Sequence, residues 1–480
     1  REIRVPNMGI RTYPYFVSDN QGFLIFGSLP AKYIYNLTRN ELTPLNKESG
    51  YHSDGATSAF VDREKTIWFT SGRGVSKIAN FIFRSLTKKH GLVEDEVTSV
   101  IELGKDHFVF GHENGITFQR NGIFQKVPFQ EMIGSRVMDM HLAKNGILYI
   151  SCAVRGLGIV YPGSGTPIWY SPGERKRITS TIEAPDGRIL TLSDNTIYEF
   201  VNSRFKQLFL DDSLHQLFRK LFVFEGDSTV YVTTSAGVLA IRGNRLIKLP
   251  YKINGASPDA YSLFKHKPND FIISAANGVY ETDGNTVTLL EGGNNKITER
   301  MFFITRDKDG FYYFGSDLGV IRWDLQSDYR MLGIAEGLAG NETNRDAGLI
   351  DTEGRLWVGT ESGVSVLDLS LLGEAPSVPE LQLHSLNLFS GESFNLNEKI
   401  SLSSGENSFY FKIRGMTFRN EEYNEYEYML EGLEKNWNRI PQRYLDNIRY
   451  FNLPPGDYVL KVRVRNGNGA WSEVVSSKEI

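Results

Sequence analysis

A small set of charged residues in this sequence could bind an acidic ligand. They occupy short polar segments between apolar runs: Arg73, His112, Glu113, Arg136, Arg155, Arg300, Arg345 and Asp346. An arginine side chain can donate paired hydrogen bonds to a carboxylate or a sulfate, which makes an acidic glycan a suitable ligand. The segments "HENG" and "VRGLG" attract most attention, because bulky polar groups there replace small residues found at the equivalent places elsewhere. An ordinary solvated loop is the competing interpretation for each residue.

Catalytic or metal-binding chemistry has no comparable support. The eight His include no pair at H-x₃-H spacing, and no G-x-S-x-G nucleophile turn occurs. A glycosidase needs two carboxylates at a defined separation, and no spacing among the 57 acidic residues selects such a pair. We therefore expect no catalytic residue, no metal and no cofactor.

The polar segments are positioned by a repeated strand pattern. In "RLWVGTESGVSVLD", Gly, Thr and Gly stand two, three and six residues after the anchor Trp357. Nine copies in register, with steps of 40 to 44 residues, place their anchors at Ile25, Trp68, Val109, Tyr149, Leu190, Tyr231, Ile272, Tyr313 and Trp357. A period near forty that contains only strand-like runs matches one four-stranded blade of a β-propeller.

Four copies also carry an Asp six residues before the anchor. These are Asp19, Asp62, Asp307 and Asp351, often with Gly close behind. A short carboxylate accepts hydrogen bonds from its own backbone turn, and Gly tolerates positive φ. We interpret the four aspartates as structural.

Composition limits the class of protein. A formal net charge of −4 over 480 residues argues against nucleic-acid binding. No apolar run reaches the length of a membrane span, and the absence of a signal peptide or an initiating Met suggests a trimmed piece of a longer protein. The single Cys152 lies in the strand-like "LYISCAV", where a buried small side chain is expected.

We predict an all-β chain whose residues 1–375 form one propeller of nine four-stranded blades, with eight as the alternative. The ninth copy is followed by the Pro-rich "LSLLGEAPSVPE", which is unlike a fourth strand. Residues 1–9 are therefore expected to pair beside residues 363–368 and close the ring, which would remove the open sheet edges.

The pattern changes after residue 376. Alternation in "YVLKVRVR" and the turn "LPPGDY" predict a β-sandwich of immunoglobulin or fibronectin type, with about seven strands, over residues 376–480. Its core is expected to contain Tyr428, Trp437, Tyr450, Tyr458 and Trp471.

These motifs resemble a known family. The repeats are similar to the regulator-propeller motif of bacterial two-component sensors, and "YEYMLEGLEKNW", "LPPGDYVLKVRVRN" and "GAWSE" resemble the triple-tyrosine domain that follows those propellers. The resemblance implies the periplasmic sensor region of a Bacteroidetes hybrid two-component system or related membrane regulator, which governs polysaccharide utilisation. A membrane helix and a cytoplasmic kinase or DNA-binding part would follow this region.

The resemblance implies a role but no site. Well-known members resemble two seven-bladed propellers in tandem, with about fourteen motifs, whereas nine occur in this chain. The expected ligand is an oligosaccharide or polysaccharide fragment, bound without turnover. A homodimer through the C-terminal domain is also expected, across "YVLKVRVRN", where Lys461, Arg463 and Arg465 alternate outward. The alternatives are a protein-interaction scaffold and a propeller glycosidase or lyase.

Overall fold

The computed structural model divides the chain into two compact units, residues 82–372 and residues 1–81 with 373–480. It describes residues 15–480 except 19–21, 29–30, 38–40, 46–54, 79–82, 130–133, 175, 211–215, 253–256, 268–269, 284–285, 293–294, 328, 373–377, 420, 422–423 and 468. Apart from short 3₁₀ turns, η2 (Lys88–His90), η3 (Ile334–Glu336), η4 (Leu369–Leu371) and η6 (Gln442–Tyr444), the elements of these residues are strands. Within the described residues, no helix is long and apolar enough to cross a membrane.

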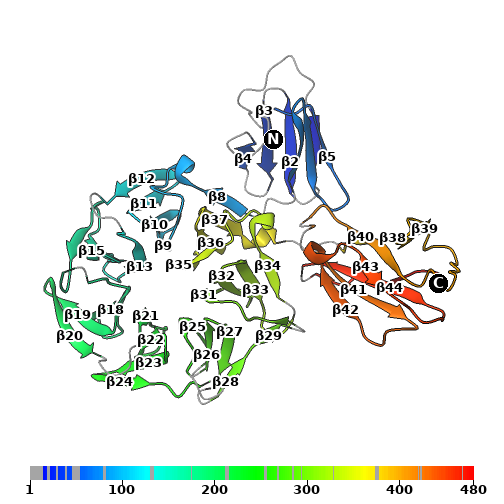
Figure 1. The fold of residues 1–480 in the computed structure, drawn as a ribbon. Helices are drawn as coiled ribbons and strands as arrows, with labels where there is room; N and C mark the ends of the chain where they lie inside the picture. The colour runs from blue at the N-terminus through cyan, green and yellow to red at the C-terminus, as the bar shows by residue number, and fades with distance from the viewer. Residues whose placement is uncertain are drawn as a thin grey trace. The chain divides into compact units, whose positions relative to one another are not determined.

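The unit of residues 82–372 is a closed ring of sheets, a β-propeller (Figure 1). Its described residues form seven four-stranded blades, each an antiparallel meander whose first strand lies innermost. Blade 1 comprises β9 (Ser99–Gly104), β10 (His107–Gly111), β11 (Gly115–Arg120) and β12 (Ile123–Pro128). Blade 2 comprises β13 (Val137–Leu142), β14 (Leu148–Cys152), β15 (Gly156–Val160) and β16 (Ile168–Tyr170). Blade 3 comprises β17 (Ser180–Glu183), β18 (Ile189–Ser193), β19 (Thr196–Val201) and β20 (Arg204–Leu210).

Blades 4 to 7 continue the same order around the axis. Blade 4 comprises β21 (Phe218–Phe222), β22 (Val230–Thr234), β23 (Gly237–Arg242) and β24 (Arg245–Lys248), and blade 5 comprises β25 (Ala260–Lys267), β26 (Asp270–Ala275), β27 (Gly278–Thr282) and β28 (Val287–Leu289). Blade 6 comprises β31 (Met301–Arg306), β32 (Tyr312–Ser316), β33 (Gly319–Trp323) and β34 (Arg330–Leu332). Blade 7 comprises β35 (Thr343–Ile350), β36 (Arg355–Thr360), β37 (Gly363–Asp368) and β8 (Phe83–Leu86). A two-stranded hairpin, β29 (Glu291–Gly292) and β30 (Asn295–Lys296), lies between blades 5 and 6 in sequence.

The ring is closed by β8, which comes from the start of the unit. This strand pairs antiparallel with β37, with Leu86 opposite Val364 and Ser85 opposite Ser365. The predicted propeller is confirmed, but the predictions of nine or eight blades are wrong. The predicted closure by residues 1–9 is also wrong, because β8 occupies the place beside residues 363–368; residues 1–9 themselves lie outside the described part of the chain.

The first two sequence repeats form sheets that are not blades of this ring. β1 (Tyr15–Ser18), β2 (Phe23–Ser28), β3 (Ala31–Asn36) and β4 (Glu41–Pro44) make one sheet. β5 (Ser58–Val61), β6 (Ile67–Ser71) and β7 (Gly74–Ile78) make another. The two sheets share a core that includes Ile25, Ile34, Ile67 and Phe69, so they pack together as blades do.

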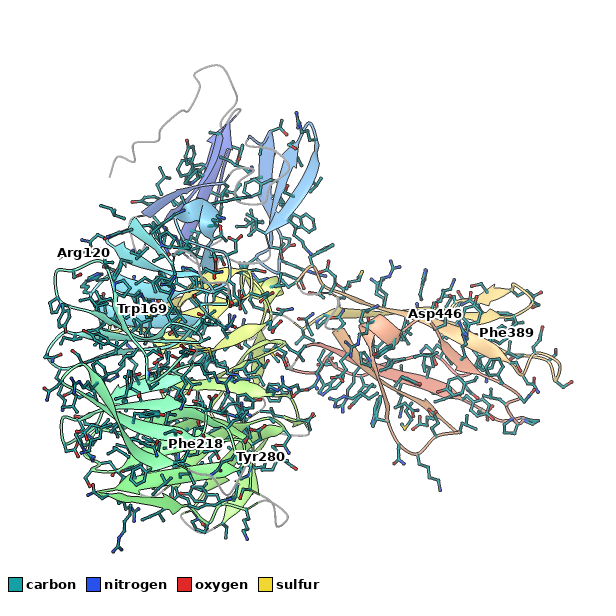
Figure 2. The ribbon with its side chains drawn as sticks, turned by 60° about the vertical axis from the view of Figure 1, so that its left-hand side comes forward. Arg120, Trp169, Phe218, Tyr280, Phe389 and Asp446 are labelled. Atoms are coloured by element: carbon teal, nitrogen blue, oxygen red, sulfur yellow. The ribbon has the colours of Figure 1, made fainter. Side chains whose placement is uncertain are left out.

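Apolar side chains between neighbouring blades hold the ring together. A separate cluster of buried residues lies at each of the seven junctions, including the junction of blade 7 with blade 1, where Trp357 packs on Phe108 with ring centroids 4.3 Å apart. Figure 2 labels Phe218 and Tyr280, two buried side chains within these layers. The stiff ring fixes the first residues of each innermost strand around the axis.

The repeated motif has a physical cause at each position. Thr360 Oγ1 accepts a hydrogen bond from the amide of Ser362 and donates one to the carbonyl oxygen of Gly363, which has φ of 152°. At Gly359, an added Cβ would lie 2.5 Å from the carbonyl oxygen of Val97 on blade 1, so only glycine permits this approach. Small residues after the anchor therefore serve the turn and the blade contact.

Residues 380–480 form the predicted β-sandwich. One sheet contains β39 (Ser393–Phe394), β38 (Glu380–Leu388), β40 (Phe409–Met416) and β43 (Ile448–Tyr450), and the other contains β42 (Asn438–Pro441), β41 (Asn424–Glu431), β44 (Val459–Asn466) and β45 (Val475–Ser476). The described strands thus number eight, one more than expected. Tyr450 and Tyr458 are in the buried core and Tyr428 packs against it, as predicted.

The two tryptophans of the sandwich motif are not in its core. The core cluster and the hydrophobic residues packed against it contain neither Trp437 nor Trp471. Instead, the Arg463 guanidinium lies 5.2 Å from the Trp437 ring and 5.0 Å from the Trp471 ring. Their predicted core role is therefore wrong, because they cover a row of arginines on the outer face of the second sheet.

Candidate ligand-binding site

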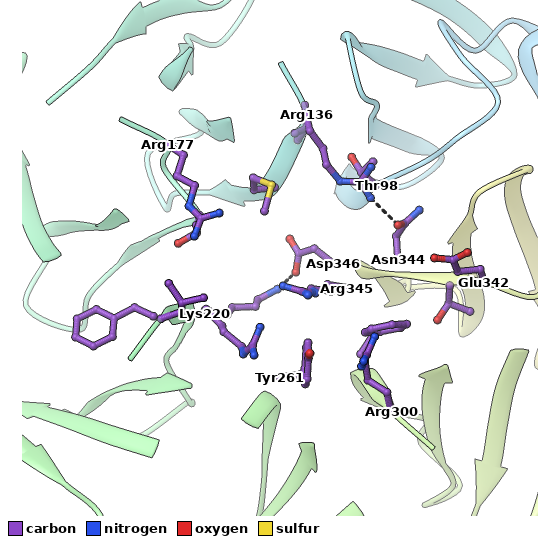
Figure 3. A pocket seen from close by; sticks show the side chains of 18 of the residues that line it. Thr98, Arg136, Arg177, Lys220, Tyr261, Arg300, Glu342, Asn344, Arg345 and Asp346 are labelled. Carbon is purple, nitrogen blue, oxygen red and sulfur yellow. Dashed lines mark hydrogen bonds and ion pairs between the residues drawn. The ribbon is translucent and has the colours of Figure 1, made fainter. Parts of the chain in front are cut away.

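A cavity of about 500 Å³ lies at the axis of the ring, where the innermost strands converge (Figure 3). It falls within the range typical of small-molecule sites. The lining residues come from all seven blades: Thr98, Arg136, Val137, Met138, Arg177, Thr179, Leu217, Phe218, Arg219, Lys220, Tyr261, Arg300, Phe302, Asp317, Glu342, Thr343, Asn344, Arg345 and Asp346. Most of them lie at or just before the beginning of an innermost strand.

The lining carries an excess of positive charge. Six of its side chains are cationic, from Arg136, Arg177, Arg219, Lys220, Arg300 and Arg345. Three are carboxylates, from Asp317, Glu342 and Asp346. Since the walls exclude part of the solvent, these charges interact more strongly than on an open surface.

Arg136 is held between two acidic residues at the margin of the cavity. Its Nη1 lies 2.6 Å from Glu96 Oε1 and 3.2 Å from Glu113 Oε2. Its Nη2 donates a hydrogen bond of 2.7 Å to Asn344 Oδ1, which connects blades 2 and 7. Arg136 is therefore fixed in place and largely neutralised.

Lys220 reaches across the axis to carboxylates of two other blades. Its Nζ forms an ion pair with Asp346 on β35, drawn in Figure 3, and lies 3.6 Å from Asp139 Oδ1 on β13. Asp346 also accepts a hydrogen bond from Ser99, and Asp139 accepts one of 2.6 Å from Ser180. These contacts connect five blades around one ammonium group.

Two further arginines have counter-ions behind them. Arg177 Nε lies 2.6 Å from Asp194 Oδ1, and Arg219 Nη2 lies 2.5 Å from Asp259 Oδ1. The Arg219 guanidinium also lies 4.1 Å from the centroid of the Tyr261 ring. Tyr261 in turn contacts Phe302 edge to face, with centroids 5.8 Å apart.

Arg345 and Arg300 differ from the other four cations. Neither forms an ion pair with any residue that the structure describes. Arg345 places its guanidinium 4.7 Å from the Tyr261 centroid. Burial, followed by the nearby positive charge of Arg219, lowers the pKa of Arg345, and Arg300 contributes in the same direction.

The structure brings together four of the eight residues singled out from the sequence. Arg136, Arg300, Arg345 and Asp346 line the cavity, as expected for segments that enter an innermost strand. Glu113 lies beside the cavity as a partner of Arg136. The four singled-out residues that line the cavity all come from segments at the beginning of a first strand, whereas Arg73, His112, Glu113 and Arg155, from the turns between second and third strands, do not line it. One other residue of such a turn, Asp317 between β32 and β33, does line it.

Three of the singled-out residues have other environments. His112 is fully buried, with Nε2 2.8 Å from Thr117 Oγ1 and Nδ1 2.8 Å from the carbonyl oxygen of Glu96, so it supports blade 1. Arg155 lies over the rings of Phe129 and Trp169, outside the cavity lining. Arg73 is in the β6–β7 turn and does not belong to the ring unit.

Sequence reasoning missed Lys220, Arg219, Arg177 and Tyr261. The first two are inside "LFRKLF", which reads as an apolar strand with two charges. Their position in the repeat could have predicted them, because Lys220 and Tyr261 are among the first residues of the innermost strands β21 and β25. The resulting arrangement can bind an anion through guanidinium groups, and it can bind ligand hydroxyl groups through exposed polar side chains such as Glu342.

A family model described as the Y_Y_Y domain matches residues 417–480, the second part of the sandwich. This match confirms the triple-tyrosine domain inferred from "YEYMLEGLEKNW" and "LPPGDYVLKVRVRN". A comparison with curated proteins found no match.

Solved structures resemble the fold at low sequence identity. The extracellular domain of the candidate hybrid two component system BT3049 from B. thetaiotaomicron has a TM-score of 0.72 at 17% identity, over 97% of this chain and 72% of its own. That of the candidate hybrid two component system BT4673 from the same organism has a TM-score of 0.50 at 15% identity, over 96% and 68%. A catalytically inactive virginiamycin B lyase from Staphylococcus aureus, crystallised with quinupristin, has a TM-score of 0.50 at 13% identity, over 60% and 99%. The chain thus has, over nearly all of its length, the propeller-and-sandwich fold of a bacterial sensor's extracellular domain.

Proposed function

We propose that this chain is the extracytoplasmic ligand-sensing region of a membrane-bound signalling regulator. In this proposal, an oligosaccharide released from a polysaccharide binds in the central cavity without turnover, and the signal controls use of that polysaccharide. The fold similarity and the Y_Y_Y match support a sensing role. The choice of the cavity rests on its own chemistry.

The convergence of seven blades on one polar cavity is the observation that carries the proposal. Oligosaccharides present hydroxyl groups in several directions, so a site must offer donors and acceptors from several sides. Arg177, Arg300 and Glu342 present such groups from three blades, just before strands that interblade packing holds rigid. A preformed site of this kind loses little conformational entropy on binding.

Binding rather than hydrolysis fits the state of the carboxylates at the axis. Asp346 is engaged by Lys220 and Ser99, and Asp139 by Ser180 and the amide of Thr181. The oxygens of both carboxylates are thus already engaged by an ammonium group, a hydroxyl or a backbone amide. These groups therefore suit a structural role beneath the ligand.

Isothermal titration calorimetry with a panel of plant and animal oligosaccharides tests the proposal. A Met138→Trp variant should abolish binding, because the larger side chain fills the cavity from β13. The matched control is Ile123→Trp on the outer strand β12, where the native side chain is 76% exposed. Equal binding by both variants would place the site elsewhere, and release of product over hours would indicate an enzyme.

A further inference from the structure

The unpaired cations of the cavity define one particular place within it. Arg136, Arg177, Arg219 and Lys220 each have a carboxylate partner at 3.2 Å or less or in direct ion-pair contact. Arg300 and Arg345 have no such partner among the described residues. A cation facing other cations is destabilised, and a bound anion would remove that repulsion.

The surroundings of Arg345 hold its guanidinium in an orientation suited to an anion. The group lies against the face of Tyr261, which Arg219 also contacts, and Phe302 supports the same ring from its edge. Contact of a guanidinium with an aromatic face leaves its N–H groups, which lie in the guanidinium plane, available at the edge. Figure 3 shows Arg300 and Tyr261 on the same side of the cavity.

We propose that Arg345 and Arg300 form an anion subsite that takes a carboxylate or sulfate group of the ligand, with Tyr261 positioning Arg345. The inference rests on the proposed function, which supplies the oligosaccharide part of the ligand; the subsite adds the anionic group. It assigns the ligand to the acidic oligosaccharides, which carry uronic acid carboxylates or sulfate esters. The paired acidic partners of Arg136 exclude that residue from the same role, although it lines the same cavity.

Simple anions test the subsite without knowledge of the sugar. Sodium sulfate and sodium acetate are titrated into the full chain by calorimetry at constant ionic strength, with chloride as the balancing ion. Wild-type protein should bind one of them saturably, and Arg345→Gln and Arg300→Gln should each weaken that binding at least tenfold. Arg345→Lys should recover only part of it, because lysine keeps the charge but loses the paired donors.

Arg245→Gln is the matched control, since Arg245 is an exposed arginine on the outer strand β24 of the same ring. Melting temperatures show whether the variants fold. Without added sulfate, Arg345→Gln should melt at the wild-type temperature or above, because it relieves repulsion. Preference for sulfate over acetate would assign a sulfate ester to the ligand, and the reverse would assign a uronic acid.

The two proposals fail in different ways. If wild-type protein binds neither anion better than chloride, or if both Gln variants bind as wild type does, the anion subsite is wrong. Binding of neutral oligosaccharides that Met138→Trp abolishes would then leave the sensing proposal intact. Anion binding that the Gln variants lose, with no oligosaccharide bound, would support the subsite and contradict oligosaccharide sensing.

Discussion

A single carboxylate, Asp351, fixes the geometry of a whole blade corner. Its Oδ1 accepts hydrogen bonds from the amides of Glu353 and Arg355, and its Oδ2 accepts one of 2.8 Å from Trp357 Nε1. Asp62 with Trp68, and Asp307 with Tyr313, repeat the bond to the anchor. The sequence spacing predicted the turn correctly, but the bond to the anchor's polar tip was not foreseen; Asp19 lies outside the described residues.

Replacement of this carboxylate should be costly. Asp351→Ala leaves the Trp357 indole N–H unpaired and removes one partner of Arg355, both largely buried. We expect a loss of about 3 kcal/mol in the free energy of unfolding, measured by urea denaturation. Asp186→Ala is the control, because Asp186 occupies the corresponding turn of blade 3 with its side chain 53% exposed, and should cost less than about 1 kcal/mol. Equal losses would show that the indole bond contributes nothing.

Asp227, in blade 4, makes the folding stability depend on pH in the acidic range. Burial alone would raise the pKa of Asp227, but Lys265, the amide of Thr229 and the Tyr231 hydroxyl lower it to about 2 from 3.8. A carboxyl with a depressed pKa stabilises the folded state above its unfolded-state pKa, and this contribution disappears as the pH falls through the folded-state pKa. Its contribution should therefore fall by about 1 kcal/mol between pH 6 and pH 3.

The measurement compares wild type with Asp227→Asn by urea unfolding at both pH values. The stability difference between the two proteins should be smaller at pH 3. The same difference at pH 6 and pH 3 would contradict the assigned cause.

Single residues of the cavity were partly predictable for a clear reason. Arg300 and Arg345 stand in segments that enter an innermost strand, and the repeat register located those segments. The register could not show that His112 is satisfied by Glu96 and Thr117, or that Lys220 meets Asp346 from a distant blade. Such contacts depend on how the ring curves, which a local pattern does not contain.

At the scale of elements, the repeat of about forty residues predicted the individual sheets, but it did not predict which sheets belong to the same ring. Nine repeats follow one pattern, yet two of them form sheets outside the ring and seven form the ring with β8 as its last strand. The segment "FRSL" of β8 is short and alternating like other outer strands, so pattern alone does not choose between it and the N-terminal segment. The strand that closes the ring is determined by its pairing with β37, a contact between segments far apart in the sequence.

A disulfide across the closure tests that register. Ser85 and Ser365 lie opposite each other with their Oγ atoms 2.7 Å apart, so Ser85→Cys with Ser365→Cys should form a bond on oxidation. Because the bond closes a loop of 280 residues, it should stabilise the fold by about 5 kcal/mol, seen as a higher melting temperature that reductant reverses. Ser85→Cys with Val366→Cys is the control, since the shifted residue faces the other side of the sheet. Failure of the first pair to crosslink would refute closure by β8.

At the scale of the whole molecule, the ring contains everything that its own closure requires. All seven interblade cores and the closing strand lie within residues 82–372. We expect this fragment to fold alone and to melt in one transition. A fragment of residues 91–372, which lacks β8, should melt at least about 5 °C lower because blade 7 loses its outer strand. Equal melting temperatures of the two fragments, measured by circular dichroism, would contradict the closure.

On the sandwich face that was expected to form a dimer, the arginines of β44 form ion pairs with glutamates of the neighbouring strand β41. Arg465 binds Glu425 at 2.7 Å with its side chain 4% exposed, and Arg463 binds Glu427 at 2.5 Å. Both arginines are thus engaged by carboxylates of their own sheet. Elsewhere on the sandwich, Phe389 and Phe451 stack with centroids 5.3 Å apart and are 54% and 61% exposed; Figure 2 labels Phe389. Exposed aromatic residues are enriched in protein interfaces.

We propose that the sandwich contributes to a two-fold dimer, the commonest closed assembly, through the surface that carries these two phenylalanines. Sedimentation velocity over a range of concentrations should show association of the full chain and none of residues 82–372. Phe389→Ser with Phe451→Ser should abolish the association, because the buried aromatic area supplies its free energy. Phe16→Ser with Phe60→Ser, at positions 66% and 62% exposed outside the sandwich, should leave it unchanged. Monomeric behaviour of the full chain throughout, or equal association of the ring fragment, would show that the sandwich does not drive dimer formation.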